Sequence, residues 1–145
     1  MITVARHTII AVPPATTWAL VRDFNALPDW NDMVISSRIE DGPADRIGCR
    51  RILMFDDGVI WTHKLIALSD ATITLSYSIV DTPPSMRMPI WDYGATIGVS
   101  HESANGACRI DWRADFATDH IVEMAERAGQ VFESGFVGLR RKLLG

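Results

Sequence analysis

Between residues 34 and 117 the sequence is a succession of strand-like segments, and few folds accommodate such a succession. Six segments rich in β-branched and aromatic residues follow one another at short spacing. Turn signals separate them, among them Asp56-Asp57-Gly58 and the strong hairpin signal Asn105-Gly106. Residues 2–11 form one more alternating segment before this run. The sequence therefore predicts an antiparallel meander preceded by a further strand.

Helical regions are predicted on both sides of this run. Two prolines at 13 and 14 end the first strand, and proline suits the first turn of a helix, so residues 14–24 are predicted to be helical. Pro28 ends or kinks that helix, and a second short helical turn should carry Trp30 and Met33. Trp30 is the puzzling residue here, because a broken polar stretch is an unusual place for a large indole.

The C-terminal region, from about residue 119 to 143, changes to helical spacing. Its apolar residues predict a long amphipathic helix with Asp119 as the N-cap. Gly129, Gly135 and Gly138 are unfavourable inside a helix, costing about 1 kcal/mol each relative to alanine. They indicate either a bend or a place where the sheet or a ligand approaches the helix closely.

Length and charge narrow the class of protein. The 145 residues fit one domain, residues 1–145, and no uncharged apolar run approaches the roughly 20 residues of a membrane span. The N-terminus alternates like a strand and does not resemble a signal peptide. The net charge is −4 and no basic stripe is present, so nucleic acid is not an expected partner. Cys49 and Cys108 are expected to be reduced in a cytoplasmic protein; a disulfide has no support from their spacing.

The register of the hairpin over residues 48–67 can be predicted from its turn. A three-residue loop at Asp56-Asp57-Gly58 pairs Leu53 with Trp61 and Arg51 with His63, whereas a two-residue turn would shift the register by one. Phe55 then pairs with Val59 on the same face. The inner faces of the later strands should carry Ile73, Leu75, Tyr77 and Ile79; Trp91, Tyr93, Ala95, Ile97 and Val99; and Cys108, Ile110, Trp112, Ala114 and Phe116.

This inner face mixes aromatic rings and a few polar groups with aliphatic side chains. A sealed core favours aliphatic residues because indole N–H and phenol O–H groups need partners. A mixture of rings and polar groups is typical of ligand pockets. The alternative is a close-packed core in which these polar groups satisfy each other.

The order of segments resembles the START / polyketide cyclase / birch-pollen-allergen (SRPBCC) superfamily, over nearly the whole chain. The stretches that carry the resemblance are PPATTWALVRDFNALPDWND, IGCRRILMFDDG, IWTHKLIAL, LSYSIVDTPPSMRMPIWDY, CRIDWRADF and the terminal helix. The chain is most similar to the small bacterial members labelled polyketide cyclase/dehydrase-like. The resemblance implies an α+β helix-grip fold, in which a curved, seven-stranded antiparallel sheet wraps around a long C-terminal helix. Two short helices follow the first strand, and an apolar cavity lies between sheet and helix.

The resemblance also bears on individual residues. It places Trp30 at the rim of the cavity, either facing ligand or acting as a hydrophobic plug. Small bacterial members often pair an arginine on one strand with a glutamate on the next. Here Arg51 fits the arginine, but His63 stands at the glutamate position, so the pair cannot neutralise a buried charge and the histidine should be held neutral. Either another acid reaches Arg51, or the ligand supplies an anion or a carbonyl.

Candidate site residues follow from the predicted faces and from the resemblance. The candidates for a catalytic role are Arg51, His63, Tyr77 and Tyr93. The expected ligand-binding residues are Trp30, Arg51, Leu53, Phe55, Trp61, His63, Tyr77, Met86, Met88, Trp91, Tyr93, Trp112, Met124 and Ala128. Met86 and Met88 would form an adaptable lip of the cavity, with ordinary packing under a loop as the alternative. The histidines and cysteines lack metal-ligand spacing, and no phosphate-binding loop or nucleophile elbow occurs, so neither a metal nor a cofactor is expected.

Three functions remain open from the sequence. The first is binding of a small hydrophobic or amphipathic molecule, such as a lipid, a steroid or a polyketide-like compound, by a monomer or homodimer. The second is a polyketide cyclase or dehydratase acting on such a ligand; it rests on analogy, because one fold hosts many functions. The third is a protein-interaction module with a vestigial cavity.

Overall fold

A computed structural model of the chain describes residues 1–81, 89–102 and 106–145. Its strands form one antiparallel, seven-stranded sheet in the order β1-β7-β6-β5-β4-β3-β2. The strands are β1 (Ile2–Ile10), β2 (Val34–Glu40), β3 (Arg50–Phe55), β4 (Ile60–Ser69), β5 (Thr74–Val80), β6 (Ile90–His101) and β7 (Cys108–Thr118), and the helices are α1 (Pro14–Val21), α2 (Leu27–Trp30) and α3 (Ile121–Leu144).

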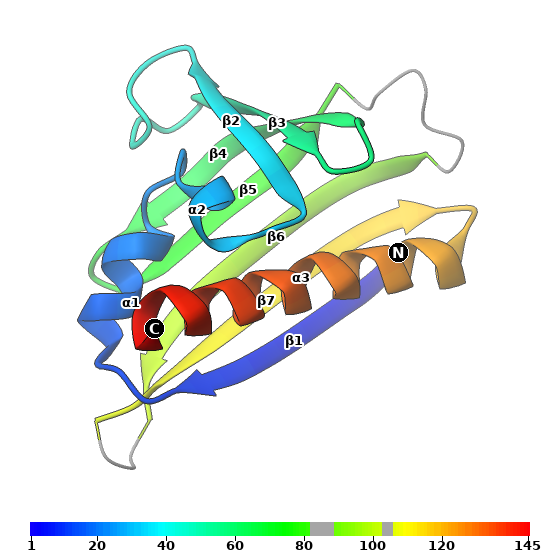
Figure 1. The fold of residues 1–145 in the computed structure, drawn as a ribbon. Coiled ribbons are helices and arrows are strands. Elements are labelled where there is room, and N and C mark those ends of the chain that lie inside the picture. The colour runs from blue at the N-terminus through cyan, green and yellow to red at the C-terminus, as the bar shows by residue number, and fades with distance from the viewer. Residues whose placement is uncertain (82–88, 103–105) are drawn as a thin grey trace.

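The sheet curves around α3, and the short helices α1 and α2 lie at the end of the sheet where α3 ends (Figure 1). This arrangement is the helix-grip fold, so the predicted α+β class is confirmed. Most connections in the sheet are between neighbours in sequence, as a meander requires, and β1 joins the edge next to β7. Within the described ranges, no helix combines the length and the apolar composition that a membrane crossing requires.

The β3–β4 hairpin has the predicted register. Leu53 pairs with Trp61 and Arg51 pairs with His63. Gly58 adopts a φ of 82°, in the left-handed region that a three-residue loop requires, and the Phe55 N–H donates to the Val59 carbonyl at 3.0 Å. Both pairs are buried, so this face of the hairpin points toward α3 as expected.

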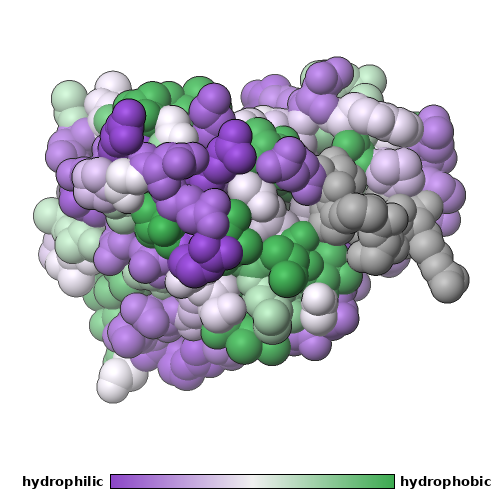
Figure 2. Space-filling view, turned by 90° about the horizontal axis from the view of Figure 1, so that it is seen from above, coloured by the Kyte–Doolittle hydropathy of each residue, from purple (hydrophilic) through white to green (hydrophobic). Residues whose placement is uncertain are grey.

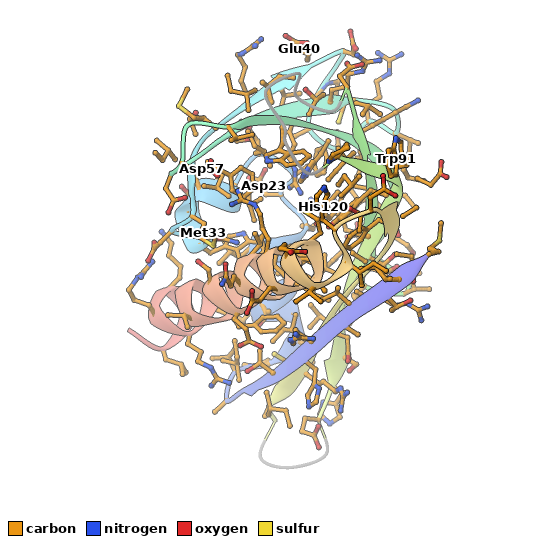
Figure 3. All side chains as sticks on the ribbon, turned by 90° about the vertical axis from the view of Figure 1, so that its right-hand side faces the viewer. Asp23, Met33, Glu40, Asp57, Trp91 and His120 are labelled. Carbon is orange, nitrogen blue, oxygen red and sulfur yellow. The ribbon has the colours of Figure 1, made fainter. Side chains whose placement is uncertain are left out.

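Trp91 corrects the predicted inner face of β6. We expected it to point inward, but 47% of its surface is exposed and its neighbour Ile90 is buried instead. The register shifts between Trp91 and Gly94, where Asp92 has a φ of 53°. This bulge reverses the alternation of sides on one part of the strand. Trp91 therefore lies on the outer surface of the sheet, away from α3 (Figure 3).

The start of α3 also differs from the prediction. The helix begins at Ile121, and His120 occupies the N-cap position that was assigned to Asp119. No side chain caps the helix; instead the His120 N–H donates to Thr118 Oγ1 at 3.1 Å. Of the two interpretations of the glycines in this helix, a bend or a close approach, the structure favours close approach of neighbouring residues to the helix. A Cβ at Gly135 would lie 2.7 Å from the Trp112 ring and 3.0 Å from the Trp30 ring.

Trp30 is held by this contact between α2 and α3. Its ring lies 5.6 Å from that of Trp112, and a Cβ at Gly138 would lie 1.9 Å from its backbone oxygen. The neighbouring Asn31 is fully buried; its Nδ2 donates to the Val131 carbonyl at 3.0 Å, and Ser134 Oγ donates to its Oδ1 at 2.9 Å. The broken stretch thus packs tightly on α3 through Trp30 and Asn31, and we call these two residues and their contacts with α3 the brace.

Candidate functional site

A small, largely apolar pocket lies between the concave face of the sheet and the N-terminal half of α3. Its volume is about 60 Å³. Several lining side chains, such as Ile79 and Val131, are only partly buried, so the pocket is not sealed from solvent. The lining residues are Phe55, Trp61, His63, Tyr77, Ile79, Ile90, Tyr93, Phe116, Met124, Arg127, Ala128, Val131 and Phe132.

Arg51 lies behind one wall of this pocket. It is 4% exposed, and its guanidinium stacks between the rings of Phe24 and Tyr77, with Cζ 4.1 Å and 4.8 Å from their centroids. Its Nη1 donates to the Phe24 carbonyl at 3.1 Å, and its Nε donates to His63 Nδ1 at 3.1 Å. Among the ion pairs of the described residues, none includes Arg51. A main-chain carbonyl and a neutral ring therefore take the place of the carboxylate.

The protonation of His63 follows from these contacts. A guanidinium carries only hydrogen-bond donors, so Nδ1 of His63 must accept. Burial and the nearby charge of Arg51 together hold the pKa of His63 well below its usual value near 6.5. Burial also lowers the pKa of Arg51, to about 10, which still leaves it charged at neutral pH. The imidazole is thus neutral, as the sequence predicted, and its proton lies on Nε2.

Two tyrosines continue the polar wall. The ring of Tyr77 stacks on His63 with centroids 4.6 Å apart, and Trp112 Nε1 donates to its hydroxyl at 3.2 Å. Burial raises the pKa of Tyr77, and burial together with the neighbouring Tyr77 raises that of Tyr93 well above its usual value. Both phenols therefore remain protonated at neutral pH and are able to donate hydrogen bonds.

Arg127 brings a second cation to the pocket, at its rim. Its Nη2 lies 3.0 Å from Asp57 Oδ2 in the β3–β4 turn, and its Cζ lies 5.6 Å from the centroid of Phe55. Both partners of the ion pair are partly exposed, so the pair contributes little to stability, about 0–1 kcal/mol. It nevertheless connects the β3–β4 turn to α3 directly beside the pocket.

The structure brings about half of the predicted site residues together. Those that line the pocket are Phe55, Trp61, His63, Tyr77, Tyr93, Met124 and Ala128. Four others are buried but do not line the pocket, namely Trp30, Arg51, Leu53 and Trp112, and Trp91 is outside on the sheet surface. Met86 and Met88 lie outside the described residues.

Ile79 and Phe116 were predicted on the inner face but not as ligand-binding residues. The lining residues that were not expected at the site at all are Ile90, Arg127, Val131 and Phe132. For Ile90 the cause is the bulge at Asp92, which exchanged it with Trp91. Arg127 and Val131 follow Met124 at helical spacing, so the helical period alone was sufficient to find them. Among the described residues, no three His, Cys, Asp or Glu side chains gather as metal ligands would.

Comparisons with known proteins agree with the observed fold. The family model described as "Polyketide cyclase / dehydrase and lipid transport" matches residues 1–144. A search of curated proteins found no match.

Solved structures share the fold at low sequence identity. The protein XoxI from Bacillus cereus is 24% identical with a TM-score of 0.87, covering 99% of this chain and 96% of its own. A protein from Thermobifida fusca is 25% identical with a TM-score of 0.78, covering 98% and 93%. Ara h 8.0201 is 19% identical with a TM-score of 0.76, covering 99% and 97%. The first and third of these, below 25% identity, show the fold alone.

Proposed function

Because the chain belongs to the polyketide cyclase / dehydrase and lipid transport family, we propose that it binds a small hydrophobic or amphipathic molecule, such as a lipid, a steroid or a polyketide-like compound, between the sheet and α3. The observation that carries this proposal is the pocket itself. Its walls are mainly aromatic and aliphatic, and the residues with polar groups on the sheet side are Trp61, His63, Tyr77 and Tyr93. A few convergent polar groups in an apolar hollow are typical of sites that bind and orient small molecules.

The volume of the pocket sets a condition on the ligand. About 60 Å³ is well below the roughly 300–1,000 Å³ of sites that enclose a drug-sized molecule. We propose that one end of the ligand enters and that the lining of α3 adjusts around it. Met124 is the natural adaptable element, because its unbranched side chain fills irregular spaces. Arg127 at the rim suits the polar end of an amphipathic ligand.

The proposal can be tested by filling the pocket. Ala128→Phe places a ring into the space that Ala128 lines, while Val137→Phe adds the same ring on the outward side of α3, where Val137 is 61% exposed. Native mass spectrometry of gently purified protein would look for a co-purified apolar molecule, and titration with ethylbenzene by NMR would measure binding directly. We expect Ala128→Phe to abolish binding and Val137→Phe to preserve it. Equal binding by both variants would contradict the pocket as the site.

A cyclase or dehydratase activity is the second candidate function, favoured by the cluster of polar groups on one wall. Ring closure requires a base as well as donors to a developing oxyanion. The contact with Arg51 occupies the lone pair of His63 Nδ1, so this wall offers donors but no imidazole base. The geometry therefore supports binding more than catalysis. If chemistry occurs, His63→Ala and Arg51→Ala should abolish turnover and leave apolar binding largely intact.

The interaction module remains the outcome to expect if no small molecule binds. The outer surface of the β3–β4 hairpin exposes Met54 and Ile60, which pair across the strands. Figure 2, which looks down on the β2 and β3 side, shows apolar side chains scattered among polar ones.

We further propose a cytoplasmic protein, monomeric or homodimeric, with Cys49 and Cys108 as free thiols. Light scattering of the purified chain would establish the oligomeric state.

A further inference from the structure

We propose that His63 Nε2–H is the group that recognises the ligand, by donating a hydrogen bond to a carbonyl or carboxylate oxygen, and that Arg51 is a positioning residue that fixes the imidazole for this task. The inference rests on the proposed function, since it names the chemical class of the ligand's inner end. A hydrocarbon lacking an oxygen acceptor would fill the same space without this bond.

The orientation of the imidazole is determined on its Nδ1 side. Arg51 directs two nitrogens at this atom, Nε at 3.1 Å and Nη2 at 3.0 Å. Both can only donate, so the ring keeps its lone pair on Nδ1 and its proton on Nε2. The stacking of Tyr77 on the ring, with planes inclined by 17°, restricts rotation as well. The tautomer and the plane of His63 are therefore set before any ligand arrives.

The other ring nitrogen has no hydrogen-bond partner in the part of the chain that the structure describes. Among the hydrogen bonds of the described residues, none uses Nε2 of His63, whereas Nδ1 takes part in two. His63 lines the pocket and is 6% exposed, while Arg51 does not line it. An N–H on the pocket lining that no described residue accepts is available to a molecule in the pocket. A ligand oxygen, or water in its absence, is the acceptor that this geometry leaves room for.

The charge behind the ring reinforces this choice. Arg51 is a buried cation, and its described hydrogen-bond partners are a neutral imidazole and the Phe24 carbonyl. Its positive charge polarises the imidazole toward a more acidic Nε2–H, because hydrogen bonds in a low-dielectric site polarise one another. Among the described residues that line the pocket, Arg127 is the one cation, and at the rim it is paired with Asp57. Electron-rich oxygen is thus favoured at the inner wall as well as at the mouth.

Matched probes distinguish the acceptor from the hydrocarbon. Acetophenone and ethylbenzene have nearly the same shape but differ by a carbonyl oxygen, and benzoate supplies a carboxylate. NMR titrations of the whole chain give a Kd for each. We expect acetophenone, benzoate or both to bind roughly 2- to 12-fold more tightly than ethylbenzene, the range of one net hydrogen bond. The stronger of the two then identifies the acceptor as carbonyl or carboxylate.

Two ring substitutions on the same hairpin assign the donor. His63→Phe keeps a planar ring but removes the N–H, and it should abolish the preference for the oxygen-bearing probe while ethylbenzene still binds. Trp61→Phe removes another N–H from the pocket lining and should retain the preference. Loss of the preference in Trp61→Phe and its survival in His63→Phe would overturn the assignment.

Nitrogen NMR of ¹⁵N-histidine-labelled wild type gives an answer even if His63→Phe fails to fold. It should show His63 protonated on Nε2, with a signal that moves on addition of acetophenone or benzoate and not of ethylbenzene. In Arg51→Met the tautomer should become mixed, which a merely structural loss would not produce. A ring protonated on Nδ1 in wild type would refute the inference. If all three probes bind equally, the inference fails while the proposed function stands; if none binds, both fail.

Discussion

Replacing Gly138 by alanine should separate α2 from α3 and destabilise the protein strongly. The added Cβ would lie 1.9 Å from the backbone oxygen of Trp30 and 2.6 Å from its carbonyl carbon. Non-bonded atoms do not approach so closely, and backbone atoms cannot rotate away as the end of a side chain can. The brace around Trp30 would therefore have to move by about 1 Å in a close-packed interior.

The size of the effect follows from what that movement disrupts. Overpacking of this kind costs about 1–3 kcal/mol. The movement also strains the two bonds of Asn31 to Val131 and Ser134, each worth about 0.5–1.5 kcal/mol. Alanine recovers about 1 kcal/mol of helix propensity relative to glycine. The expected net loss is about 3 kcal/mol, a large part of the ~5–15 kcal/mol that stabilises a typical domain.

The same helix supplies a control with the opposite sign. A Cβ at Gly129 would meet only the end of the Arg6 side chain, at 2.9 Å, and that side chain is partly exposed and free to shift. Gly129→Ala should therefore stabilise the chain, by up to about 1 kcal/mol. Urea unfolding followed by tryptophan fluorescence measures both variants. Equal stability of Gly138→Ala and wild type would show that α2 does not contact α3 as described.

Further measurements test other parts of the structure. Burial and Arg51 hold the folded-state pKa of His63 below its unfolded value near 6.5, so the unfolded chain binds an extra proton as pH falls below about 6.5. The free energy of unfolding should then drop by up to about 1.4 kcal/mol per pH unit. In urea titrations between pH 7 and pH 5, His63→Phe should reduce this slope. Trp91→Ala should cost well under 1 kcal/mol in thermal unfolding, whereas Trp112→Ala, at 2% exposure, should cost about 3–5 kcal/mol; the reverse order would place Trp91 inside the sheet after all. Asn31→Ala should lose about 2–3 kcal/mol by calorimetry because it leaves buried partners unsatisfied, and a neutral result would contradict its role between α2 and α3.

The sequence was sufficient for the fold where local signals and periodicity agree. The turn at Asp56-Asp57-Gly58 determined the register of its hairpin, and that register placed Arg51 opposite His63. The prediction from sequence was wrong at β6 because the bulge there depends on the backbone conformation of Asp92. An aspartate in the left-handed region has no distinctive sequence pattern. A period of two then assigns Trp91 to the wrong side.

The candidate site was harder to predict because its decisive partner is a main-chain atom. The sequence analysis considered an acid or a ligand as the group that satisfies Arg51. The structure supplies the carbonyl of Phe24, from the segment between α1 and α2, and a histidine lone pair. Every residue has a carbonyl, so no residue type signals such a contact. Only the tertiary arrangement shows that Arg51 is behind the wall rather than in it.

The two halves of α3 have separate tasks, and this separation matters for anyone who wishes to redesign the molecule. Glycine contacts fix the C-terminal half against α2, while Met124, Ala128 and Val131 present successive turns of the N-terminal half to the hollow. We expect that side chains at these three positions can be exchanged without disturbing the contact of α3 with α2, and under the proposed function such exchanges would change which ligand fits. The N-terminal half of α3 is thus the part to vary, because contacts with α2 already fix the C-terminal half of the same helix.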